Sequence, residues 1–162
     1  MTAQTINALR PRVSGSVITP GDQGYDEARK VYNFMIDRHP AAVVRCTGAA
    51  DVAAVVRHAA ETGTELAVRG GEHSVPGFGT ADGALVADLS SLSLVTVEPS
   101  GRTARAGGGA TWGAFNEATG AHGLATTGGI ISTTGVGGLT LGGGIGYLAR
   151  GYGLSCDNLL SA

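Results

Sequence analysis

Apolar residues recur at helical spacing in three stretches of the chain, with short extended runs between them. This spacing predicts helices over residues 25–37, 49–62 and 111–121. Thr47 is a candidate cap of the second helix, Asp51 lies favourably in its first turn, and Gly63 ends it. Residues 1–20 show no such pattern and are predicted to be irregular. The short apolar or alternating runs predict strands at residues 41–45, 66–68, 84–89, 94–97 and 103–106.

The order of these elements predicts an α+β fold. A strand–helix–strand unit comes first, a strand-rich stretch follows, and a helix and a glycine-rich run complete the chain. Because helices and sheets bury their apolar faces against one another, we expect two small α+β layers. The turn at residues 69–74, which follows a strand directly, is expected at their junction.

Glycine is the outlier of the composition, with 28 glycines among 162 residues, against about 7% in average proteins. The excess concentrates in residues 123–153, where Arg150 is the only charged residue. Such tracts are often disordered, but this one also holds large apolar residues that a solvated linker would lack. We therefore predict a folded, buried segment in which the backbone, rather than the side chains, faces a partner.

Size and charge exclude several functions. The length suits one domain with its own core, and a net charge of −2 without a basic run argues against nucleic-acid binding. No stretch approaches the ~20 apolar residues that span a bilayer, and residues 1–13 lack the apolar core of a secretory signal, so we expect a cytoplasmic protein without a membrane partner. Cys46 and Cys156 are expected to be free thiols, and the scattered histidines predict no metal site.

Two glycine-rich segments, residues 68–74 and 135–146, are the candidate binding elements. Glycine allows positive φ and lets neighbouring N–H groups converge on an anion. The run from Gly135 lacks the last glycine of G-x-G-x-x-G, and no acidic residue follows it before Asp157. No lysine is near for a Walker loop. A long dinucleotide held by backbone amides beside the imidazole of His73 fits both segments, which indicates flavin chemistry.

Together these motifs resemble the FAD-binding half of the vanillyl-alcohol-oxidase-type flavoproteins, particularly the berberine-bridge-enzyme-like branch. The matching pieces, in order and with the usual spacing, are residues 69–74, 87–90, 106–112, 135–138, 142–146 and 152–158. The resemblance runs from about Arg29 to the last residue. It implies a PCMH-type FAD-binding fold with FAD between two small α+β subdomains, about 25–72 and 73–162, after an N-terminal segment 1–24 and with the C-terminal part missing.

In this family the turn at 69–74 wraps the FAD pyrophosphate, and the histidine matching His73 is often joined to the flavin 8α-methyl. The resemblance therefore implies FAD, attached through His73, because a histidine side chain can act as a nucleophile. The alternative is that His73 only hydrogen-bonds within the loop. Arg69 either contacts the pyrophosphate or makes a local structural pair. The implied cofactor-binding residues are Arg69, Gly70, Gly71, Glu72, His73, Ser74, Gly79, Asp88, Gly129, Ser132, Thr133, Thr134, Gly135, Gly137, Gly138 and Gly142.

The second glycine-rich segment would line the other side of the cofactor with hydroxyl and amide donors. For residues 142–146, tight packing of loop on strand is the favoured reading. Bicovalent family members carry a cysteine four residues before the first glycine of the G-V-G-G motif, where this chain has Ile131. A cysteinyl link is therefore impossible, and attachment is expected through His73 alone or not at all.

The resemblance implies an FAD-linked oxidase that passes hydride from a small organic substrate to flavin N5, with O2 as the electron acceptor. Family members are much longer than this chain, and the missing part carries the substrate-binding sheet and the catalytic base. The implied partners are therefore a small-molecule substrate and the remainder of the oxidase, and no catalytic residue is assigned here. The competing hypothesis is a non-catalytic flavin-binding or interaction module.

Overall fold

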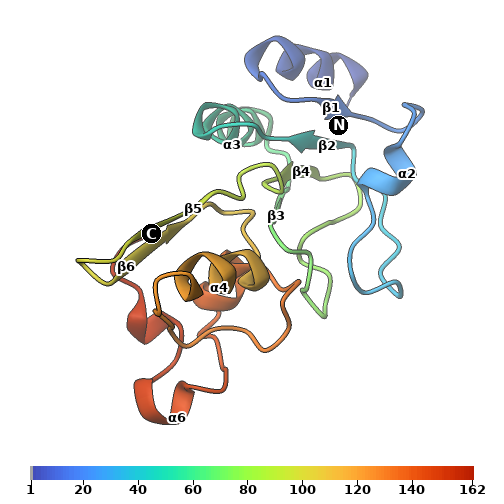
Figure 1. Ribbon diagram of the computed structural model, residues 1–162. Helices are drawn as coiled ribbons and strands as arrows, with labels where there is room; N and C mark the ends of the chain where they lie inside the picture. The colour runs from blue at the N-terminus through green and yellow to red at the C-terminus, as the bar shows by residue number, and fades with distance from the viewer. Residues whose placement is uncertain (1) are drawn as a thin grey trace. The chain divides into compact units, whose positions relative to one another are not determined.

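Residues 2–162 are described by the computed structural model, and their contacts divide the chain into two units (Figure 1). The first unit extends to Leu92 and the second comprises Ser93–Ala162, whereas the sequence suggests subdomains at about 25–72 and 73–162. The boundary lies later because the strand around residue 86 is an inner member of the first unit's sheet. Both units combine helices with strands, as the α+β class predicts.

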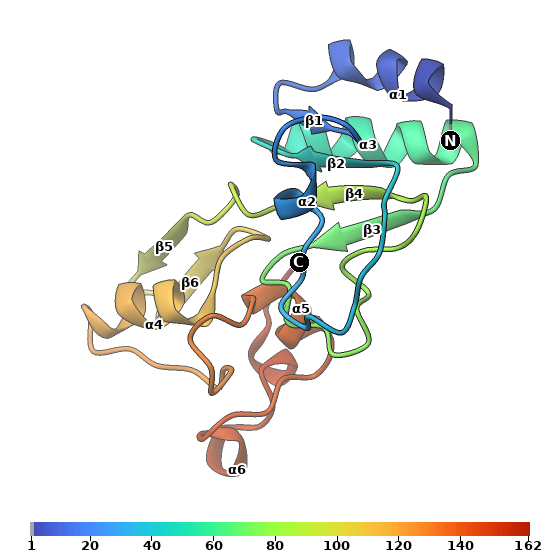
Figure 2. The same ribbon diagram turned by 90° about the vertical axis from the view of Figure 1, so that its right-hand side faces the viewer.

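A four-stranded sheet with the order β1-β2-β4-β3 forms the centre of the first unit (Figure 2). The strands are β1 Val17–Ile18, β2 Ala42–Arg45, β3 Leu66–Arg69 and β4 Leu85–Asp88. Strands β2, β4 and β3 run parallel, and β1 pairs antiparallel with β2 at the edge. All four residues of β4 are buried, which explains its nearly continuous apolar sequence, because inner strands of parallel sheets are covered on both faces.

Two hydrophobic clusters lie against this sheet. The helical elements of the unit are α1 Ala3–Leu9, the short 3-10 helix η1 Arg10–Arg12, α2 Tyr25–Ala28 and α3 Ala49–Thr62. Leu9 of α1 and Val55 of α3 pack in one cluster with Leu85. The other cluster comprises Ala28, Val43, Ala67 and Val86. Because successive strand residues point to opposite faces, neighbouring residues of β4 contribute to both clusters.

The strands predicted at 41–45, 66–68 and 84–89 and the helix predicted at 49–62 are confirmed, with ends shifted by at most one residue. Gly63 ends α3 in the left-handed region at φ 63°, as predicted. The predicted cap is wrong, because the N-cap residue is Gly48 and no side chain caps the helix there. Thr47 instead donates its backbone N–H and its hydroxyl to Asp51.

The prediction that residues 1–20 are irregular is wrong. Residues 3–18 include α1, η1 and β1, and Ile6 and Leu9 belong to the core; residue 1 lies outside the described residues. With 7 residues in α1 and 2 in β1, these elements are too short to show a period. The expected N-terminal segment 1–24 thus contributes to the first unit.

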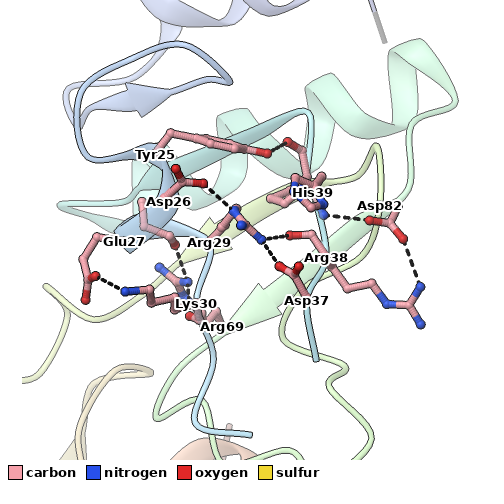
Figure 3. A network of polar contacts seen from close by, with 12 residues as sticks. Tyr25, Asp26, Glu27, Arg29, Lys30, Asp37, Arg38, His39, Arg69 and Asp82 are labelled. Carbon is pink, nitrogen blue, oxygen red and sulfur yellow. Dashed lines mark hydrogen bonds and ion pairs between the residues drawn. The ribbon is translucent and has the colours of Figure 1, made fainter. Parts of the chain in front are cut away.

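The helix predicted at 25–37 is also wrong beyond its first turn, since α2 stops before Arg29. The Arg29 guanidinium donates to the carboxylates of Asp26 and Asp37 and to the carbonyl of Arg38 (Figure 3). These contacts bring residues 37–38 back to the end of α2, which a straight helix could not do. The hydrogen bond to Asp37 also raises the pKa of Arg29. Residues 30–39 are therefore a loop that returns to its own start.

Asp51 fastens the beginning of α3 to the chain that precedes β2. Its carboxylate accepts the backbone N–H groups of Ser14, Gly15 and Thr47 at 2.8–3.1 Å, and its residue is only 3% exposed. These bonds, with that of Thr47 first, lower the pKa of Asp51. A carboxyl group with a lowered folded-state pKa stabilises the protein above its unfolded pKa of about 3.9, and this contribution is lost as the pH falls further.

Asp51→Ala is expected to lower the free energy of unfolding by about 2–4 kcal/mol at pH 7, because the backbone N–H groups of Ser14, Gly15 and Thr47 lose their charged acceptor. Urea unfolding followed by circular dichroism measures this loss. The difference from wild type should shrink below about pH 4. The exposed Glu65→Ala is the control, and equal midpoints for both variants would contradict the role given to Asp51.

The second unit consists of a hairpin and short helices. Its elements are β5 Val95–Glu98, β6 Thr103–Ala106, α4 Trp112–Gly120, α5 Val136–Leu141, α6 Ala149–Tyr152 and the 3-10 helix η2 Cys156–Asn158. The strands predicted at 94–97 and 103–106 and the helix predicted at 111–121 are confirmed. The rings of Trp112 and Phe115 meet edge to face at 5.3 Å and anchor α4 in this unit.

The glycine-rich tract is folded, as predicted, but its side chains are not generally buried. Large apolar side chains such as Leu141, Ile145 and Tyr147 are more than two-thirds exposed. Part of the glycine content has an internal cause, because a Cβ at Gly128 would lie 2.2 Å from the Trp112 ring, and one at Gly146 would lie 1.8 Å from the carbonyl oxygen of Gly128. At these positions the backbone faces the protein itself.

The remaining sequence expectations concern thiols, metals and membranes. Both cysteines are free thiols, Cys46 buried and Cys156 exposed, and burial raises the pKa of Cys46 to about 11. Among residues 2–162, no group of three or more histidine, cysteine or acidic side chains is placed to hold a metal ion. Within the same residues no helix has the length and apolarity needed to cross a bilayer.

Candidate functional site

Three charged residues stand side by side where the parallel strands of the first unit end. Arg45, Asp88 and Arg69 are the last residues of β2, β4 and β3, and the register places Asp88 opposite both arginines. The turn at 70–74 leaves the sheet at this same edge. Open sheets with parallel strands bind ligands outside the carboxyl ends of their strands, so the sequence motif lies at the edge where a ligand is expected.

Arg69 and Asp88 form a buried ion pair, with 2.8 Å between Nη2 and Oδ2 and residue exposures of 4% and 2%. Arg69 also donates Nη1 to the carbonyl oxygens of Ala28 and Lys30 (Figure 3). Burial alone would raise the pKa of Asp88, but the charge and hydrogen bond of Arg69 bring it below its usual value. The structure thus shows a local structural pair for Arg69, and its contact with the pyrophosphate stays a prediction.

Glu72 gives the turn an unusual backbone shape. Its φ is 64°, a left-handed conformation that costs an ordinary residue about 1–2 kcal/mol but helps to bring successive backbone N–H groups together around an anion. Its carboxylate lies 3.7 Å from Nε of Arg69. Burial raises the pKa of Glu72, with Arg69 acting in the opposite direction.

His73 follows Glu72 and is half-buried. Its imidazole stacks on the ring of Tyr32, with centroids 4.1 Å apart and planes 16° from parallel. Ser74 stabilises the next turn, because its Oγ accepts the N–H of Phe78 at 3.0 Å. Gly79 packs beside Arg69, where a Cβ would lie 3.6 Å from the arginine side chain. Ser74 and Gly79 thus have structural roles at this edge.

A polar pocket of about 330 Å³ opens at the strand ends. The structure brings together the sequence-predicted residues Arg69, Glu72 and Asp88 in its lining. Sequence reasoning missed the other lining residues, which are Glu27, Ala28, Lys30, Arg45, Ser90 and Ser91. An arginine ending a strand, as Arg45 and Arg69 both do, was the available signal, but only the strand order β2-β4-β3 makes it meaningful.

The predicted residues of the second unit lie around the start of α5. Residues 131–136 run beside 110–113, with the N–H groups of Trp112 and Gly113 donating to the carbonyls of Thr134 and Ser132. Gly135 bridges to Thr111 and is the N-cap residue of α5. The side chains of Ser132 and Thr133 are exposed. Backbone pairing therefore fixes this segment and leaves these two side chains at the surface.

The glycines of this second group differ in what surrounds them. A Cβ at Gly137 would meet only the carbonyl oxygen of Gly108, at an ordinary 3.6 Å, and one at Gly138 would meet nothing within 4 Å. At Gly129 a Cβ would clash with Trp112 at 2.7 Å, and at Gly142 it would lie 3.2 Å from a carbonyl of its own helix. Internal packing explains Gly129, whereas Gly137 and Gly138 fit a close approach by another molecule.

Residues 40–162 match the family described as FAD binding domain. The (R)-6-hydroxynicotine oxidase of Paenarthrobacter nicotinovorans is 37% identical over 150 residues, which cover 93% of this chain and 33% of that protein. An uncharacterized FAD-linked oxidoreductase of Bacillus subtilis (strain 168) is 35% identical over 151 residues, covering 93% and 34%. The chain thus spans about a third of the length of these curated relatives.

Solved structures are similar over the same region. The crystal structure of 6-hydroxy-D-nicotine oxidase from Arthrobacter nicotinovorans has a TM-score of 0.86 at 36% identity and covers 90% of this chain and 32% of its own. Wild-type BBE-like 1 of Physcomitrella patens has a TM-score of 0.86 at 30% identity, covering 96% and 34%. The fold expected from the sequence resemblance is confirmed.

Proposed function

Because the chain belongs to the FAD binding domain family of FAD-linked oxidoreductases, we propose that it forms the cofactor-holding part of an oxidase and carries FAD on His73. The observation that carries this proposal is the turn at the carboxyl edge of the parallel sheet, where His73 follows a residue in left-handed conformation. FAD, when bound, supplies the group that accepts a hydride from a small organic substrate and passes the electrons to O2.

The chain's own residues divide the work of holding the cofactor. The amides of residues 70–74 hold the diphosphate without a lysine, as converging N–H groups can. The Arg69–Asp88 pair fixes the strand from which this turn departs. Gly137 and Gly138 leave space for another molecule to come close to their backbone, since a Cβ at either position would meet no protein atom nearer than 3.6 Å. Position 131 is isoleucine, so the single attachment point is His73.

The remainder of an oxidase polypeptide is the proposed partner of this chain. The relatives are about three times as long, and the chain itself offers no assigned catalytic base. Ile145 and Tyr147, in the glycine-rich tract, are 72% and 85% exposed. Since exposed apolar patches commonly mark contact surfaces, this tract suits a contact with the missing part. Two free thiols agree with the proposed cytoplasmic location.

The attachment is tested by denaturing mass spectrometry of the purified 162-residue chain after incubation with FAD in air. We expect a peptide containing residue 73 to carry an added FAD mass, and we expect His73→Ala to lose this adduct completely. His122→Ala, an exposed histidine outside the site, is the control and should keep it. Flavin that leaves the wild-type chain fully on denaturation would contradict the covalent link.

A further inference from the structure

We propose that Tyr32 is a positioning residue. Its ring holds the imidazole plane of His73 in the orientation in which an imidazole nitrogen bonds to the flavin. The inference rests on the proposed attachment through His73. Its basis is the ring stack, with centroids 4.1 Å apart and planes within 16° of parallel. Tyr32 is itself 61% exposed, so burial in the core does not explain why its ring lies on the imidazole.

The backbone around Tyr32 is attached to the histidine turn on both sides of His73. The N–H of Tyr32 donates to the carbonyl of Glu72 at 3.4 Å, and Nδ2 of Asn33 donates to the carbonyl of Val75 at 2.8 Å. The loop that carries Tyr32 is anchored in turn, since Arg69 binds the carbonyl of Lys30 (Figure 3). Hydrogen bonds between the segments at residues 32–33 and 72–75 therefore hold the two stacked rings together.

Stacking restricts the rotation of the imidazole ring about the terminal torsion of the His73 side chain. The terminal torsion of a histidine is broad, and both ring nitrogens bond only in the ring plane. Attachment forms a bond between one imidazole nitrogen and the 8α carbon, and breaks a methyl C–H and an imidazole N–H. The flavin keeps both protons and one electron pair, and O2 reoxidises it to give hydrogen peroxide. A parallel aromatic face against His73 fixes the plane in which that nitrogen points.

The test compares Tyr32→Leu, which removes the aromatic face, with Tyr32→Phe, which keeps it. Each purified chain is mixed with FAD in air. The rate of adduct formation is followed by denaturing mass spectrometry, and total bound flavin is followed separately by absorbance after native desalting. We expect Tyr32→Leu to attach flavin about 10-fold more slowly or worse, as for a misplaced reacting group, with total binding unchanged. Tyr32→Phe and the control Phe34→Leu, 87% exposed in the same loop, should match wild type.

Three results would overturn the inference while leaving the proposed function intact. The first is a wild-type rate of adduct formation in Tyr32→Leu, and the second is a slow rate of adduct formation in Tyr32→Phe. The third is a fold-loss of total bound flavin in Tyr32→Leu that equals the fold-loss of its adduct-formation rate. The last would assign Tyr32 a structural role. Failure of the proposed function looks different, because wild type itself would form no adduct, or His73→Ala would still form one.

Discussion

Asp88→Ala is expected to lower the free energy of unfolding of the first unit by about 3 kcal/mol, because it removes the carboxylate that pairs with the buried Arg69 guanidinium at 2.8 Å and leaves only Glu72, at 3.7 Å from Nε. The two residues are 2% and 4% exposed. Arg69 also donates to the carbonyls of Ala28, the last residue of α2, and of Lys30 in the loop that follows. Loss of the pair should therefore loosen β3, β4 and that loop together. Urea unfolding followed by far-ultraviolet circular dichroism measures the change.

An exposed ion pair provides the matched control. Arg12 and Glu61 are 2.7 Å apart but about half exposed, so Glu61→Ala should cost no more than about 1 kcal/mol. The double variant Arg69→Met with Asp88→Leu removes both charges and should recover much of the loss seen in Asp88→Ala. Equal effects of Asp88→Ala and Glu61→Ala would show that the buried pair is not what holds this edge.

Gly146→Ala is expected to disrupt the second unit, because its Cβ would lie 1.8 Å from the carbonyl oxygen of Gly128. Backbone cannot yield as a flexible side chain can, so we expect a loss of about 3 kcal/mol, the upper range for overpacking. The single tryptophan of the chain, Trp112, lies against Gly128. In Gly146→Ala the Trp112 fluorescence should shift to the red, and the urea midpoint of unfolding that this fluorescence reports should fall.

Gly138→Ala is the matched variant, since a Cβ there meets nothing within 4 Å. In helix α5 alanine should be neutral or stabilise the fold by up to about 1 kcal/mol, while FAD retention falls because the added carbon occupies the proposed approach. Wild-type Trp112 emission and midpoint in Gly146→Ala would contradict the packing described for the tract. Full FAD retention in Gly138→Ala would remove this glycine from the cofactor site.

Sequence patterns predicted the parts of the fold that local chemistry decides. The helix at 49–62 has a long apolar face and ends at Gly63, and both features act within a few residues of one another. The helix predicted at 25–37 failed because Arg29 binds Asp37, a contact between loop residues that no periodicity encodes. The prediction that residues 1–20 are irregular failed for another reason, because their helix and strand are too short to show a repeating pattern.

The candidate site shows the same division between local and distant causes. The motif at 69–74 could be located from its glycines and histidine alone, because such a turn is a local structure. Arg45 and Tyr32 could not be located in this way. The strand order brings Arg45 next to Asp88, and a separate loop brings Tyr32 to His73. Gly129 has an internal reason to be glycine, because a Cβ there would lie 2.7 Å from Trp112, and its contact with the cofactor stays a prediction.

The most direct measurement of the central claim, that this chain holds FAD by its glycine-rich backbone, is flavin retention by the purified chain. The chain is incubated with FAD and separated from unbound flavin by native gel filtration, and visible flavin absorbance is compared with protein concentration. We predict one FAD per chain in wild type and no retained flavin in Gly137→Val with Trp112 fluorescence unchanged. A folded wild-type chain that elutes colourless would contradict the account.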